Sequence, residues 1–68
     1  MKILTKMYSD NGMREAHVVR YTTGLWVDMF ELNEEKELVQ RHKVSMEGHS
    51  ENYAEDAAEN WVTYVIRN

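Results

Sequence analysis

Apolar and polar positions follow a helical period most clearly near the C-terminal end of the chain. At about 100° per residue, one stripe of the segment 50–67 carries its apolar residues: Ala54, Ala57, Ala58, Trp61, Val62 and Val65. Acidic residues dominate the opposite side, and Arg67 lies near the end. Ser50 stands where it can cap the first turn. The pattern predicts an amphipathic helix that docks by this stripe, with Trp61 largely buried.

The rest of the chain has strand character. Segments rich in branched and aromatic residues alternate with polar turns, and we predict strands over 2–9, 13–21, 25–32 and 37–46. The fourth segment also contains good helix formers, so a partly helical alternative remains open there. The turns fall at Asp10-Asn11-Gly12, Thr22-Thr23-Gly24 and Asn33–Lys36. The order predicts an α+β fold, a four-stranded antiparallel meander (ββββα) with one C-terminal helix packed on one sheet face.

Tight turns would fix the register of this sheet. We assume two-residue loops at Asn11-Gly12, as a type I′ turn, at Thr23-Gly24 and at Glu34-Glu35. Cross-strand pairs then follow: Leu4–Val19, Thr5–Val18, Met7–Ala16, His17–Phe30, Val18–Met29, Tyr21–Trp26, Leu25–Val44, Trp26–Lys43 and Asp28–Arg41. Two of these are favourable side-chain pairs, the ionic Asp28–Arg41 and the cation–π pair Trp26–Lys43.

The register divides the sheet into two unlike faces. One is aliphatic and suits the alanine-rich helix: Ile3, Met7, Ala16, Val18, Leu25, Val27, Met29, Leu38, Val44 and Met46. The other holds most of the rings: Leu4, Lys6, Tyr8, His17, Val19, Tyr21, Trp26, Asp28, Phe30, Val39, Arg41 and Lys43. One helix cannot cover both faces, so we expect the second to be open in a monomer. Exposed aromatic surfaces of this kind are typical of interaction sites.

Two functions use this open face. In the one that we favour, the rings bury against a second copy of the chain or another protein. In the alternative, bases of single-stranded nucleic acid stack on the rings while cations contact phosphates. In both cases the expected partner-binding residues are the same: Tyr8, His17, Tyr21, Trp26, Phe30, Arg41 and Lys43.

Composition narrows the function classes further. The 68 residues are expected to form one domain, 1–68, with 12 acidic and 8 basic residues, a net charge of −4 and no cysteine. The net charge disfavours bulk nucleic-acid binding, and the absence of cysteine excludes disulfides and thiolate zinc sites. His17, His42 and His49 match no metal-ligand spacing, and His17 and His42 fall on opposite faces. We expect no catalytic residues, no cofactor, no membrane segment and a cytoplasmic location.

Two stretches carry a resemblance to a known group of proteins. The acidic helix 53–62 (YAEDAAENWV) and the early segment 7–17 (MYSDNGMREAH) resemble parts of small uncharacterised proteins of marine tailed phages, especially cyanophages. The two stretches cover less than half of the chain. The resemblance implies a phage origin and a small accessory protein that acts on host machinery in the host cytoplasm. It brings no catalytic residues with it.

Overall fold

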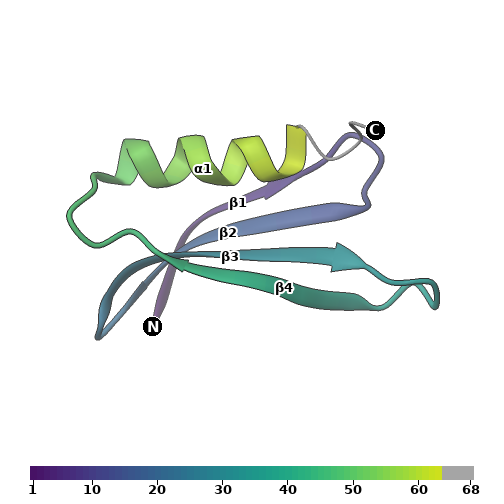
Figure 1. The fold of residues 1–68 in the computed structure, drawn as a ribbon, viewed down its shortest axis with the longest axis horizontal. Coiled ribbons are helices and arrows are strands. Elements are labelled where there is room, and N and C mark those ends of the chain that lie inside the picture. Colours follow the sequence, from purple (N-terminus) through teal and green to yellow (C-terminus); the bar gives the residue numbers. More distant parts are fainter. Residues whose placement is uncertain (64–68) are drawn as a thin grey trace.

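The chain builds one antiparallel sheet followed by one helix. A computed structural model describes residues 1–63 of the 68. It contains strands β1 (Lys2–Tyr8), β2 (Arg14–Tyr21), β3 (Gly24–Leu32) and β4 (Leu38–Ser45), and the helix α1 (Glu51–Thr63) (Figure 1). The strands lie in the order β1-β2-β3-β4. The predicted α+β class and ββββα order are confirmed, and the fourth segment is a strand rather than a helix.

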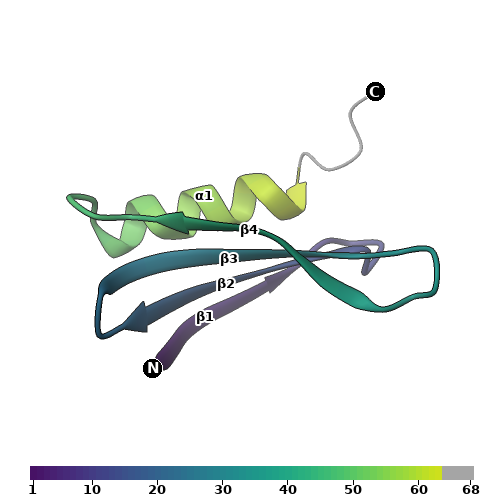
Figure 2. The ribbon, with the colours of Figure 1, turned by 60° about the horizontal axis from the view of Figure 1, so that its bottom comes forward.

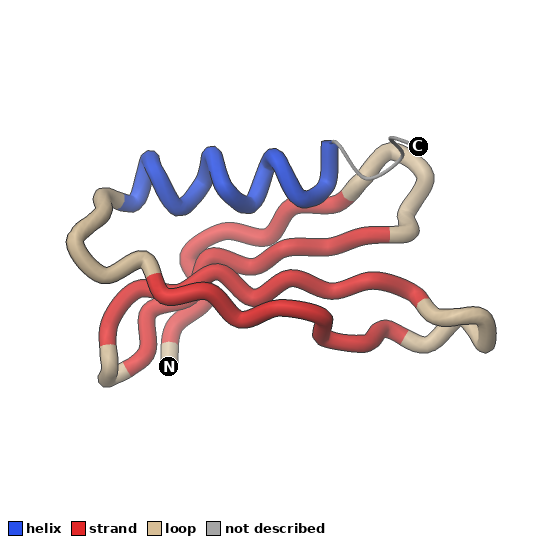
Figure 3. The backbone as a smooth tube through the Cα atoms, viewed as in Figure 1, coloured by secondary structure: helices blue, strands red, loops and turns tan. Residues whose placement is uncertain are grey.

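The helix covers one side of the sheet. It packs against β1, β2 and β3, and Figure 2 shows no helix or strand against the opposite side among residues 1–63. Short loops join the successive strands and carry the chain from β4 to the helix (Figure 3). No helix within the described part of the chain has the length and apolar character needed to span a membrane.

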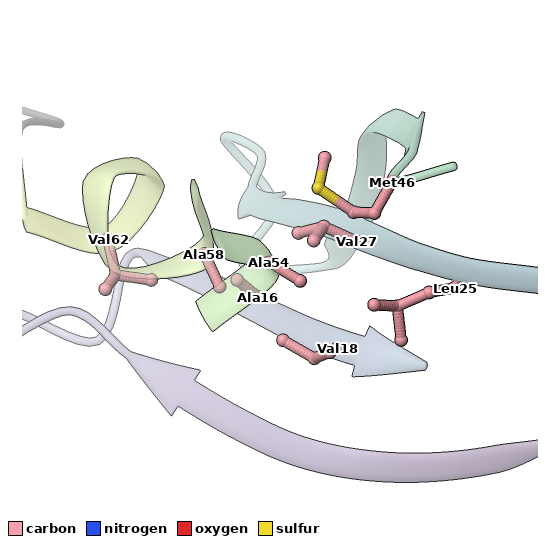
Figure 4. Close-up of a cluster of buried hydrophobic side chains, with 8 residues drawn as sticks. All are labelled: Ala16, Val18, Leu25, Val27, Met46, Ala54, Ala58 and Val62. Atoms are coloured by element: carbon pink, nitrogen blue, oxygen red, sulfur yellow. The ribbon is translucent and has the colours of Figure 1, made fainter. Parts of the chain in front are cut away.

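The core lies between α1 and the two central strands. Small residues of the helix, Ala54 and Ala58, let its backbone approach the sheet, and Val62 fills the space further along (Figure 4). The sheet contributes Ala16, Val18, Leu25 and Val27, and Met46 directly after β4 adds a further buried side chain. Burying these residues is the main contribution to stability, at about 25 cal/mol per Å² of apolar surface.

The helix begins as its sequence predicts. The Ser50 hydroxyl accepts a hydrogen bond from the Tyr53 backbone N–H at 3.2 Å, and Glu51 lies in the first turn near the positive end of the helix dipole. The predicted extension to Val65 and Arg67 lies outside the described residues. Trp61 is partly buried and packs against the core, on the side of the helix that its apolar stripe predicts.

The first hairpin keeps the predicted register with a different turn. Thr5 pairs with Val18 and Met7 with Ala16, as expected. The loop is longer than the assumed two residues, because the Ser9 N–H bonds the Arg14 carbonyl and the Gly12 N–H bonds the Ser9 carbonyl. A type I′ turn would need positive φ at Asn11 as well as at Gly12, and only Gly12 has it, at 74°. Asn11 instead accepts side-chain and backbone hydrogen bonds within the loop.

The second and third turns differ from the assumed loops, and this shifts the register. Tyr21 pairs with Gly24, so the second loop is Thr22-Thr23 and β3 moves by two positions relative to β2. The third loop has three residues, Glu34 to Lys36, closed by a bond from the Asn33 N–H to the Glu37 carbonyl, with Lys36 at φ 68°. This is a type I turn followed by a left-handed residue. Five predicted direct pairs therefore do not form, and their residues have other partners: Tyr21–Trp26, His17–Phe30, Val18–Met29, Leu25–Val44 and Trp26–Lys43.

Two bulges, which the sequence analysis did not anticipate, change which residues share a face. Ile3 pairs with Val19 and Thr5 with Val18, so Leu4 is the extra residue in β1. Ile3 therefore lies on the side away from the helix, and Leu4 packs against the core, the reverse of our prediction. The predicted Leu4–Val19 pair is wrong for the same reason.

The second bulge lies in β4. Met29 pairs with His42 and Phe30 with Gln40, so Arg41 is the extra residue. In the part of β4 that precedes Arg41, Leu38 pairs with Leu32 on the side away from the helix, and Val39 pairs with Glu31 on the helix side. Both assignments are the reverse of the prediction, and Asp28 pairs with Lys43 rather than with Arg41. His17 and His42 remain on opposite faces, as expected.

Candidate functional site: the aromatic face

The sheet surface away from the helix carries most of the predicted partner-binding residues. We call it the aromatic face and define it by the side chains that share this side in the observed register: Ile3, Lys6, Tyr8, Glu15, His17, Val19, Tyr21, Trp26, Asp28, Phe30, Leu32, Leu38, Gln40, Lys43 and Ser45. The rings partly cover the sheet beneath them. Val19 is only 1% exposed, although no helix or strand covers it among the described elements.

Tyr21 and Trp26 form the best-defined part of this face. Their ring centroids lie 6.5 Å apart with the planes at 84°, an edge-to-face contact between diagonal neighbours. The Lys43 ammonium lies 4.1 Å from the Tyr21 ring centroid and 5.5 Å from that of Trp26. The Trp26 indole N–H donates to the Thr23 hydroxyl at 3.1 Å. The two rings are therefore fixed by several contacts and have a cation over them.

A buried carboxylate lies beside these rings. Asp28 is only 5% exposed, and the Tyr21 hydroxyl donates to its Oδ2 at 2.5 Å. This hydrogen bond raises the pKa of Tyr21 above its ordinary value of 10.0, and burial and the Asp28 charge act in the same direction. The other carboxylate oxygen, Oδ1, is buried without a hydrogen-bond partner among residues 1–63. Such an acceptor is costly to leave unpaired.

His17 and Phe30 form a second pair of rings. Their centroids lie 4.7 Å apart, again as diagonal rather than direct neighbours. The His17 Nε2 lies 2.5 Å from a Glu15 carboxylate oxygen, and the two side chains are only 14% and 17% exposed. The histidine predicted to contact a partner is thus already engaged within the chain.

Arg41 does not join this group. It is the extra residue of the β4 bulge, and its Nε lies 3.3 Å from Glu31. Glu31 also pairs with Arg14 at 3.3 Å, whose guanidinium lies 3.7 Å from the Trp61 ring centroid. The predicted Asp28–Arg41 pair is therefore wrong, and Arg41 belongs to an ionic group beside the end of the helix.

The bulges also bring apolar residues to the aromatic face that the sequence analysis had placed elsewhere. Ile3 is 40% exposed and Leu38 46% exposed, alongside Tyr8 at 59%. A bulge leaves no reliable mark in a single sequence. The three-residue turn at Glu34–Lys36 was the one sequence feature that could have signalled part of the shift in β4.

Charges on this face are unevenly exposed. Its acids, Glu15 and Asp28, are bonded to His17 and Tyr21, while its lysines, Lys6 and Lys43, are exposed. Most of the other acids lie on the helix and in the loops. Residues 1–63 contain no cluster of three or more histidine, aspartate or glutamate side chains that could hold a metal ion.

Known proteins offer no close comparison for this arrangement. No family model, no curated protein and no solved structure matches the chain.

Proposed function

We propose that this chain is a small non-enzymatic interaction protein that self-associates through its aromatic face. The observation that carries the proposal is the position of the exposed apolar side chains. Ile3, Tyr8 and Leu38 are each at least 40% exposed and all lie on the side of the sheet away from the helix. Together with the half-buried rings of Tyr21, Trp26 and Phe30, they form the kind of surface that a second copy would bury.

The fixed geometry of the rings supports a protein partner. Tyr21 is bonded to Asp28, Trp26 to Thr23, and the two rings contact each other. Aromatic anchors that are held in place before binding lose little conformational entropy on association. Each Å² of apolar surface buried would contribute about 25 cal/mol before the costs of association.

The resemblance to small phage proteins extends this proposal. A phage protein of this size could present the same face to a host protein in the host cytoplasm, in place of or after self-association. The aromatic face would then be shared between two partners, a second copy of the chain and the host protein.

Sedimentation velocity over a range of concentrations tests self-association. We expect wild type to sediment at twice the chain mass or more at high concentration, and Tyr8→Glu to remain a folded monomer. Tyr53→Glu is the matched control, because Tyr53 is also exposed, at 49%, but lies on the helix. A wild-type protein that stays monomeric at the highest concentration, or a Tyr53→Glu variant that dissociates as readily as Tyr8→Glu, contradicts the proposal.

Single-stranded nucleic acid is a second candidate, favoured by the exposed charges. Lys6 and Lys43 are exposed on the face, while its acids are engaged in hydrogen bonds. In this case Lys43→Glu and Trp26→Ala should each abolish binding of a labelled oligonucleotide. Wild-type affinity should also fall steeply as salt is added. Fluorescence anisotropy that shows no binding at low salt removes this candidate.

A further inference from the structure

The corner formed by Tyr21 and Trp26 already holds an ammonium group. The two ring planes meet at 84°, and the Lys43 Nζ lies within cation–π range of both, at 4.1 and 5.5 Å from the centroids. Asp28, bonded to Tyr21, stands directly opposite Lys43 across β3 and β4. We propose that Tyr21, Trp26 and Asp28 form a binding site for the primary ammonium group of a partner's lysine, and that Lys43 fills it in the free chain.

The chemistry of the site matches this ligand in two independent ways. The faces of aromatic rings attract cations through their negative quadrupole, and two rings set at a right angle can contact one ammonium group from two sides. Asp28 adds a negative charge that is 95% buried beside them, where screening by water is weak. An uncharged or anionic side chain would be attracted neither by the ring quadrupoles nor by the charge of Asp28.

The unpaired oxygen of Asp28 selects for an ammonium that carries N–H donors. Oδ1 is buried without a hydrogen-bond partner, and Lys43 has no carboxylate oxygen within 4.0 Å in the described part of the chain. Lys43 therefore contacts the rings of the site but forms no hydrogen bond to Asp28 Oδ1. Once the Asp28 carboxylate rotates to expose this buried oxygen, a lysine that enters from a partner would gain the hydrogen bond to Oδ1 that Lys43 lacks, which gives a physical reason for the exchange.

This inference rests on the proposal that the aromatic face binds protein, and it adds what the partner presents to the face. The two are separable by experiment. Self-association is measured by sedimentation, whereas the ammonium site is tested on the protein at a concentration at which it is monomeric, with small blocked amino acids as probes.

The experiment uses the indole N–H resonances of the chain's two tryptophans. Blocked lysine should shift the Trp26 resonance saturably in Lys43→Ala, and leave the Trp61 resonance, on the helix side and bonded to the Phe30 carbonyl, unchanged. Wild type should bind about tenfold more weakly or worse, because tethered Lys43 competes at an effective concentration of order millimolar or above. Lys6→Ala is the matched control and should behave as wild type.

Two further probes isolate the role of Asp28. Blocked trimethyllysine keeps the positive charge but has no N–H, so it should bind Lys43→Ala roughly tenfold more weakly than blocked lysine, as expected for one lost charge-assisted hydrogen bond. Blocked norleucine should not bind. Equal affinity for lysine and trimethyllysine overturns the role of Oδ1. A Trp26 resonance that does not move, or that moves together with that of Trp61, overturns the site, and neither result requires an Asp28 variant to fold.

Discussion

One residue of this fold has a strained backbone conformation. Lys36 has φ 68°, in the left-handed region, and it is the one non-glycine residue with positive φ among residues 1–63. A side chain with a Cβ is strained there, whereas glycine adopts this conformation readily. The turn that joins β3 and β4 therefore keeps a lysine where a glycine would be more stable.

Replacement of Lys36 by glycine should stabilise the protein. Relief of the left-handed strain is worth about 1 kcal/mol, which for a domain of this size corresponds to a rise in Tm of about 4–8 °C. Thermal unfolding followed by circular dichroism measures it. Lys36→Ala removes the same charge but keeps the Cβ, so it should show no such gain, and an equal rise in both variants would assign the effect to charge instead.

Tyr21 should make stability depend on alkaline pH. Its pKa is raised above 10.0 in the folded chain, first by the hydrogen bond to Asp28. Stability from this contact is therefore fully present below the unfolded-state pKa and is lost as the pH rises through the higher folded-state pKa. Urea unfolding at a series of alkaline pH values should show a steeper loss of stability for wild type than for Tyr21→Phe. Parallel pH profiles for the two proteins would contradict this account.

At the scale of elements, the β4 bulge and the helix are linked through one hydrogen bond. The Trp61 indole N–H donates to the Phe30 carbonyl at 2.9 Å, at the point where the pairing of β3 with β4 shifts. The Arg14 guanidinium lies over the same ring, and the His42 ring meets it nearly at a right angle, with 5.3 Å between the centroids. The half-buried tryptophan thus joins α1 to β2, β3 and β4 through contacts of its ring and its indole N–H.

Substitution of Trp61 should weaken the attachment of the helix in two steps. Trp61→Phe keeps a ring but loses the indole N–H, and should cost about 1 kcal/mol. Trp61→Ala also removes the packing against the core, and should cost roughly 2–4 kcal/mol, less than for a fully buried ring. Urea unfolding measures both. Unchanged midpoints in both variants would show that the helix is held by its alanines and Val62 alone.

At the scale of the whole molecule, the two sides of the sheet have different surroundings. The helix and the loops carry most of the acidic residues, while the aromatic face exposes lysines and apolar side chains. The net charge of −4 is therefore not spread evenly. Repulsion between two copies is smallest when their aromatic faces meet and their acidic helices point apart, since like charges at a distance are screened by salt.

Self-association through this face should appear as a dependence of thermal stability on concentration. A dimer that dissociates on unfolding is stabilised by mass action, so its Tm rises with protein concentration. Differential scanning calorimetry over a hundredfold range of concentration, roughly, should show this rise for wild type and a flat Tm for Tyr8→Glu. A wild-type Tm that does not change over the same range would contradict self-association.

The sequence predicted the elements well and the finer geometry less well. Apolar periodicity and Ser50 located the helix, and branched and aromatic residues located all four strands. Errors of two positions in register left residues on their predicted faces, as in β2, β3 and the part of β4 after Arg41, because side chains in a strand alternate with period two. For this reason Tyr21, Trp26 and Lys43 still meet, though as diagonal rather than direct neighbours.

The errors that changed faces came from single inserted residues. Leu4 and Arg41 each add one position to a strand, and in each strand the residues that precede the extra one lie on the reverse of their predicted sides. The energy that favours a bulge comes from tertiary packing, such as that of Leu4 against the core, which a local pattern does not contain. The hydrogen bond from Tyr21 to Asp28 was missed because the predicted register assigned Asp28 to Arg41 as an ionic partner.

The meander order has a consequence for how fast the chain folds. Each strand pairs with the next one along the chain, so the sheet forms from neighbouring segments and closes only short loops, which favours rapid folding. The helix packs against β1, β2 and β3, so its attachment closes much longer stretches of chain. We therefore expect the sheet to be formed in the folding transition state before the helix docks, so that Trp61→Ala speeds unfolding and leaves the refolding rate nearly unchanged.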